Sequence, residues 1–184
     1  KIRGSTGQGA VAKSPWIRIS RSQDSQKFSE SIGNVVMLFS VDFQSLYLTV
    51  ALRTEYGRRR SDEMQSRTET LGEFVKERLP DNLKNDDRLM FGPIDLRADK
   101  DKHGLAYSYQ TSTICSIKYE KGAIPEDSQI ISDILGFLDI HSGLAASDLN
   151  EALYDTHDNG YYALMRLSSR EAIIQSIAEF ESIG

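Results

Sequence analysis

The feature that most constrains the fold is an unbroken apolar run, Val35 to Phe39, followed after a short turn by strict alternation from Leu46 to Leu52. A continuous apolar run bounded by turn residues favours a strand that is buried on both faces. Alternation of apolar residues at period two predicts a second strand. Residues 42–45 supply the turn between them. The sequence therefore predicts a β-sheet at the centre of the molecule.

Further elements are predicted on both sides of this pair. Residues 62–79 have apolar residues at helical spacing and stop at Pro80, and a second helix opens after Pro125 and ends at Gly143. The additional strands are expected at residues 16–20, 94–96 and 106–119. The fold class is thus α+β: a twisted mixed or antiparallel sheet of about five or more strands, with helices packed against it.

The last residues change in character. An Asp158-Asn159-Gly160 turn predicts a hairpin, and a capping box at Ser168–Glu171 opens a final helix. We expect two parts, residues 1–143 as the main domain and residues 144–184 as a C-terminal hairpin and helix. This extension is either the start of an adjoining module or a lobe packed on the sheet.

Composition narrows the class of protein. The chain has 184 residues, 39% hydrophobic and 27% charged, which is typical of one globular domain with an appendage. No apolar run reaches membrane-spanning length, and residues 1–3 lead into glycines rather than into a signal segment. The single cysteine, Cys115, cannot form an internal disulfide and is expected to be a buried strand residue. These features predict a cytoplasmic protein.

Charge argues against a protein that coats nucleic acid. The formal net charge is −5, from 22 Lys and Arg against 27 Asp and Glu. Basic residues gather in two groups, between residues 1 and 21 and between residues 53 and 60. Such a basic N-terminal face either contacts phosphates locally or belongs to two solvated loops.

A glycine-rich segment beside the only tryptophan is the candidate site. Residues 4–9 read Gly-Ser-Thr-Gly-Gln-Gly, and Trp16 follows Pro15. Glycines let a backbone approach a ligand closely, and the indole offers a broad π face. Proline before it places Trp16 at the edge of a strand. The alternative is a surface turn followed by a tryptophan that fills the core.

Catalytic motifs are missing. Gly9 is followed by Ala10 rather than by the Lys-Ser/Thr of a P-loop, and no strand precedes the glycines as a dinucleotide site requires. The three histidines lack metal-ligand spacing. Asp95, Asp99 and Asp101 are conceivable nuclease carboxylates, but a solvated turn explains them better. We therefore expect no catalytic residues, no metal and no cofactor.

The succession of motifs resembles the N-terminal domain of McrB-type modification-dependent, 5-methylcytosine-specific restriction proteins. The resemblance runs over residues 1–143. It rests on the glycine segment, Ser14–Ile17, Gly33–Phe39 with Asp42-Phe43 and Leu46–Leu48, Ile94–Leu96, His103-Gly104, the Tyr107 segment expected as a strand, Ile114–Tyr119 and the helix after Pro125. It implies a module that flips a modified cytosine out of double-stranded DNA into an aromatic pocket.

The resemblance also implies roles for individual residues. Gln8, between Gly7 and Gly9, occupies the position of the wedge that fills the vacated stack, and Trp16 lines the pocket. The remaining pocket positions are Leu38, which keeps the family's apolar character, Asn34, which replaces a tyrosine, and Tyr107. Asn34 suits a hydrogen bond to a base edge, which leaves the identity of the modification open. Candidate phosphate contacts, from charge and location, are Ser5, Thr6, Lys13, Arg18 and Arg21.

The resulting hypothesis is a non-catalytic DNA-recognition module of a restriction system. Cutting would come from a motor or nuclease domain or subunit. Two alternatives remain at this stage: a protein-interaction or assembly domain of a defence complex, which the acidic net charge favours mildly, and a nuclease using the carboxylates around Asp95.

Overall fold

The computed structural model describes residues 2–5, 15–20, 33–52, 61–100 and 103–146. The chain separates into a unit of residues 1–146 and a unit of residues 147–184, and every described residue belongs to the first. The hairpin and final helix expected after residue 147 lie outside the described residues.

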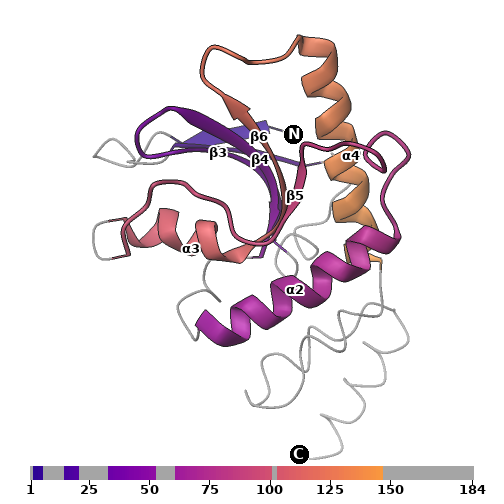
Figure 1. Cartoon of the computed structure of the whole chain (residues 1–184), viewed down its shortest axis with the longest axis horizontal. Coiled ribbons are helices and arrows are strands. Elements are labelled where there is room, and N and C mark those ends of the chain that lie inside the picture. The colour runs from indigo at the N-terminus through magenta and orange to yellow at the C-terminus, as the bar shows by residue number, and fades with distance from the viewer. Residues whose placement is uncertain (1, 6–14, 21–32, 53–60, 101–102, 147–184) are drawn as a thin grey trace, which may run out of the picture. The chain divides into compact units, whose positions relative to one another are not determined.

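A six-stranded sheet forms the centre of the first unit (Figure 1). The strand order is β1 (Ile2–Ser5), β2 (Trp16–Ile19), β3 (Asn34–Phe39), β4 (Ser45–Ala51), β6 (Thr113–Glu120) and β5 (Leu89–Phe91). Every neighbouring pair is antiparallel. The prediction of an α+β fold built on a sheet is confirmed.

The central strands β3 and β4 form the hairpin that the sequence predicts. Leu38 lies opposite Tyr47 and Met37 opposite Leu48, so alternate residues fill the two faces of the sheet. All four of these side chains are buried, which explains why β3 is apolar from Val35 to Phe39. We call the surface that carries Leu38 and Tyr47 the front face and the opposite surface the back face.

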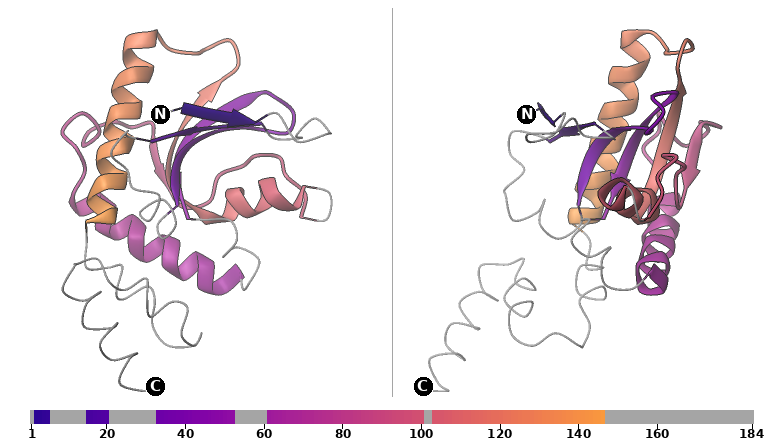
Figure 2. Two further views of the ribbon diagram at one scale, coloured as in Figure 1. Left: turned by 180° about the vertical axis from the view of Figure 1, so that it is seen from behind. Right: turned by 90° about the vertical axis from the view of Figure 1, so that its left-hand side faces the viewer.

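In the part of the chain that the structure describes, three helices pack on this sheet: α2 (Ser61–Glu77), α3 (Gly104–Ser112) and α4 (Asp127–Ala145). The back face is covered by α4, whose buried Asp133 accepts a hydrogen bond from Tyr119 of β6. Nε2 of His141 in α4 lies 3.3 Å from the carbonyl oxygen of Gly33, the residue directly before β3. Figure 2 shows α4 running along one side of the sheet and α3 on the other. Within the described residues, no helix combines the length and apolarity needed to span a bilayer.

Two sequence predictions are wrong. Residues 106–112, expected as a strand, belong to α3, and only residues 113–119 of that segment are strand. Hydroxyl groups in α3 bond to carbonyls one turn earlier, as Ser108 does to Gly104 and Thr111 to Tyr107, so residues typical of strands satisfy their polar groups within a helix. Residues 94–96 do not form a strand of the sheet, and the strand at that edge is β5 instead.

Candidate functional site

Trp16 begins β2 at one end of the front face. Its Cα partner on β3 is Leu38, and its partner on β1 is Ser5. Pro15, which cannot donate a ladder hydrogen bond, instead accepts one from the Phe39 amide at 3.1 Å. The indole is partly buried rather than sealed in the interior. Trp16 is therefore firmly placed at a strand end while part of its surface remains open.

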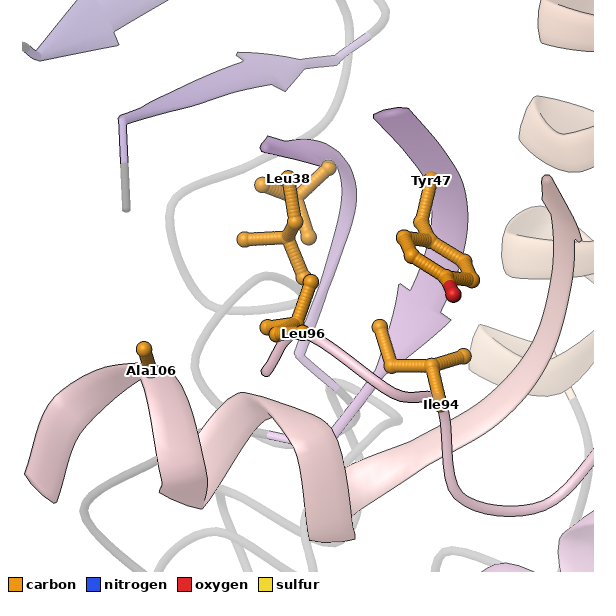
Figure 3. Close-up of a cluster of buried hydrophobic side chains, with 6 residues drawn as sticks. Leu38, Tyr47, Ile94, Leu96 and Ala106 are labelled. Atoms are coloured by element: carbon orange, nitrogen blue, oxygen red, sulfur yellow. The ribbon is translucent and has the colours of Figure 1, made fainter. Parts of the chain in front are cut away.

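A hydrophobic cluster supports the indole from behind. The cluster joins β3, β4, the segment of residues 94–98 and α3, and Trp16 packs against it. Figure 3 shows its side chains converging from these elements between the sheet and α3. Its buried members are Val36, Leu38, Tyr47, Ile94, Leu96 and Ala106. A wall of buried apolar side chains fixes the orientation of the ring that packs on it.

Hydrogen bonds to the backbone of residues 94–98 hold this segment in place. The side-chain oxygen of Gln110 in α3 accepts a hydrogen bond from the Leu96 amide at 3.0 Å. The Gln110 carbonyl accepts the amide of Ile94, and the Leu96 carbonyl accepts the amide of Val41 in the β3–β4 hairpin. This segment therefore ties α3 to the hairpin next to Trp16.

Tyr47 adds a polar end to the cluster. Its hydroxyl donates to the Asp95 carbonyl at 3.1 Å, and the Lys118 ammonium lies 5.8 Å from its ring centroid. Burial raises the pKa of Tyr47, so the phenol stays neutral and remains a donor at physiological pH. No sequence motif marks Tyr47 as a site residue. Its place in the alternation of β4 nevertheless puts it on the sheet face opposite to that of Leu46 and Leu48.

The four predicted pocket residues are not equally close. Trp16 and Leu38 are direct neighbours across two strands. Asn34 lies on the same face of β3 but at its other end, opposite Ala51, about 13 Å from Leu38 at 3.3 Å per residue. Tyr107 is half-buried on α3, whereas the α3 contacts to the cluster are made by Ala106 and Tyr109.

The predicted phosphate contacts and wedge are only partly described. Arg18 is half-buried on β2, on the same face as Trp16 and opposite Val36. Ser5 ends β1, so the glycine-rich segment begins inside a strand. The other predicted members lie outside the described residues: Thr6, Gly7, Gln8, Gly9, Lys13 and Arg21.

The acidic residues considered as nuclease ligands have other partners. Asp95 accepts the Arg97 amide at 2.9 Å and pairs with the Arg97 guanidinium at 3.3 Å. The Asp99 amide donates to Nδ1 of His103, and Asp101 lies outside the described residues. Across the described ranges, no three His, Cys, Asp or Glu side chains gather as metal ligands would.

Comparison with known proteins gives one match. The model of the family described as "MrcB-like, N-terminal domain" matches residues 1–146, which confirms the predicted resemblance. No curated protein and no solved structure matches the chain significantly. Because the match covers most of the 184 residues, the chain belongs to the MrcB-like N-terminal domain family.

Proposed function

We propose that this chain reads modified cytosine in double-stranded DNA by flipping the base out of the duplex and stacking it on Trp16. Family membership supports the coarser part of this statement, DNA binding in restriction defence. The observation that carries the finer part is the position of Trp16, partly open at the end of the front face with Leu38 beside it and a buried cluster behind it.

The energetics of flipping explain why a supported indole matters. Extruding a base costs about a few kcal/mol of unstacking. Stacking on one aromatic side chain returns about 1–3 kcal/mol, so Trp16 offsets a large part of that cost. An indole fixed by packing loses little conformational freedom on binding, which preserves this gain. Leu38, a proposed pocket residue, is buried beside Trp16 and supports the indole from behind.

The remaining pocket and contact residues complete the proposal. Asn34 and Tyr107 remain proposed pocket residues. Each needs its own variant, because Asn34 lies at the other end of β3 from Leu38 and Tyr107 lies on α3 rather than on a strand next to Trp16. Gln8 is the proposed wedge, with Gly7 and Gly9 beside it. The proposed phosphate contacts are Ser5, Thr6, Lys13, Arg18 and Arg21.

We assign no catalysis to this chain. Its family is generally non-catalytic, and cleavage in the proposed system comes from a motor or nuclease domain or subunit that acts in the cytoplasm. The partners are thus a duplex carrying a modified cytosine and this effector.

A panel of duplexes tests the proposal. The duplexes share one sequence and differ only in one cytosine substituent: none, 5-methyl, 5-hydroxymethyl or N4-methyl. Fluorescence anisotropy of the full chain should show tighter binding to at least one modified duplex. Trp16→Ala should lose about 5-fold to 150-fold in affinity for that duplex, the equivalent of one stacking contact. Phe74→Ala on α2, a half-buried aromatic elsewhere, is the matched control and should bind as wild type. Equal affinity of the wild type for all duplexes would refute the proposal.

One observation favours a second candidate, a protein-interaction module. Ile131 and Leu135 lie one turn apart on α4 and are 57% and 52% exposed. Salt dependence separates the two candidates. DNA affinity should fall with a log–log slope of about −0.9 per phosphate neutralised, whereas an apolar protein contact would change little with salt.

A further inference from the structure

An exposed phenylalanine stands at the tip of the β3–β4 hairpin. Phe43 is 48% exposed, and its backbone has φ of 57°. The left-handed region is disfavoured for residues with a β-carbon and especially for bulky ones. Among the described residues, only Phe43 and Arg97 are non-glycine residues with positive φ. A glycine at this position would relieve the strain, so the aromatic ring itself needs an explanation.

Hydrogen bonds hold the tip in this conformation. The Ser40 hydroxyl donates to the Asp42 carboxylate at 2.6 Å and accepts the Ser45 amide at 2.9 Å. The Asp42 carboxylate also accepts the Gln44 amide, and the Ser40 carbonyl accepts the Phe43 amide at 3.0 Å. These bonds therefore hold the backbone of the turn, with Phe43 at its tip, in one conformation. Strained residues held this way are concentrated at functional sites.

The tip lies at the end of the sheet where Trp16 begins. Phe39, whose amide bonds to Pro15, lies on the back face beside Leu38, and its ring centroid is 6.1 Å from that of Phe43. Val41, two residues further along the hairpin, donates its amide to the carbonyl of Leu96, directly before the strained Arg97. Figure 1 shows the β3–β4 hairpin and the start of α3 on the same side of the first unit. Both strained residues thus belong to loops at the end of the sheet where Trp16 begins.

The surrounding charges favour contact with bases rather than with phosphates. The hydrogen bond from Ser40 lowers the pKa of Asp42, so the tip carries a negative charge beside Phe43 at neutral pH. Arg97 on the adjoining loop attracts Asp42 and also pairs with the Asp95 carboxylate at 3.3 Å, so one cation there faces two carboxylates. A phosphate would be repelled by Asp42, whereas an aromatic ring can pack against bases, as apolar wedges do in other DNA complexes.

We propose that Phe43 is a second aromatic contact to DNA, packing its ring against the bases next to the flipped nucleotide. This inference rests on the proposed function and deepens it. Trp16 receives the extruded base, and Phe43 supports the disturbed stack that remains in the duplex.

Three variants of the full chain test the contact. Phe43→Gly removes the ring and relieves the backbone, so its melting temperature should equal or exceed that of the wild type. Its affinity for the preferred modified duplex should fall about 5-fold to 100-fold, the loss expected for one stacking contact. Phe43→Tyr keeps the ring and should bind within about twofold of the wild type. Ile131→Ala, which removes an equally exposed apolar side chain from α4, should not alter DNA binding.

The outcomes separate this inference from the proposed function. Wild-type affinity in Phe43→Gly, or an equal loss in Phe43→Tyr, would overturn the Phe43 contact even where the wild type discriminates modified from plain DNA. If the wild type binds both duplexes equally and Phe43→Gly weakens both, the contact stands and the proposed reading of a modified base fails.

Discussion

Gly33 offers the sharpest test of the sheet on which the site is built. It precedes β3 with φ of 95°, and a β-carbon at this position would lie 1.7 Å from the Ala51 carbonyl oxygen. The smallest spacing that real β-carbons show is 3.0 Å, so β3 and β4 would have to separate locally by more than 1 Å. Backbone strain costs about 1–3 kcal/mol. Overpacking adds about 1–3 kcal/mol, and each ladder hydrogen bond lost adds about 1 kcal/mol. We expect Gly33→Ala to lower the free energy of unfolding by at least about 4 kcal/mol.

Two further alanine variants separate strain from collision. Gly92 has φ of 90° but open space around it, so Gly92→Ala should show the strain alone, about 1–3 kcal/mol. Gly104 opens α3 with neither constraint, and Gly104→Ala should be neutral or stabilising by up to about 1 kcal/mol. Urea unfolding of the full chain, followed by Trp16 emission and far-UV circular dichroism, gives the three values. A Gly33→Ala variant as stable as Gly92→Ala would refute this reasoning.

Three other predictions concern the back face and the core. Asp133→Ala should destabilise the fold by about 3–5 kcal/mol, because buried Asp133 accepts bonds from Arg88 and Tyr119 that would lose their partner; Tyr119→Phe should cost about 1.5–3 kcal/mol. The hydrogen bond from Arg88 lowers the pKa of Asp86 below its usual 3.8. The stability that the Arg88–Asp86 pair contributes is therefore complete above pH 3.8 and is lost as the pH falls through the lowered pKa. Asp86→Asn should therefore flatten the acid loss of stability. Burial raises the pKa of Cys115 to about 12, so a thiol reagent at pH 8 should react only with unfolded chain.

Each of these predictions has a contradicting result. Urea unfolding that shows less than about 0.5 kcal/mol of loss in Asp133→Ala would mean that the buried network contributes little. An unchanged acid transition in Asp86→Asn would remove Asp86 from the pH dependence. Rapid labelling of Cys115 at a rate independent of urea would show that β6 opens without global unfolding.

The sequence predicted the parts of the fold whose signal is local. Strands β3 and β4 and helices α2 and α4 follow from apolar periodicity and from the prolines that bound them. Helix α3 was missed because its two tyrosines and its threonine have strand propensities, whereas the contacts of Ala106 and Tyr109 with the cluster hold the segment as a helix. Tertiary packing outweighs a weak local preference in such a segment.

The site was predictable only in part, for a related reason. A short apolar strand after a proline identifies Trp16 as the first residue of a strand, but the pairing of Trp16 with Leu38 depends on strand register. The strain at Phe43 has no sequence signal either, because a phenylalanine in a turn is not expected to adopt positive φ. Pairing between distant segments determines the first feature, and hydrogen bonds within the turn of residues 40–45 determine the second.

The emission of Trp16, the chain's only tryptophan, tests the central claim most directly. Titration of the full chain to saturation with a modified duplex should quench the indole, because the extruded base stacks on it. The matched plain duplex, bound to the same saturation as judged by anisotropy, should leave most of the emission unchanged. Equal emission in the two saturated complexes would contradict stacking of a modified base on Trp16.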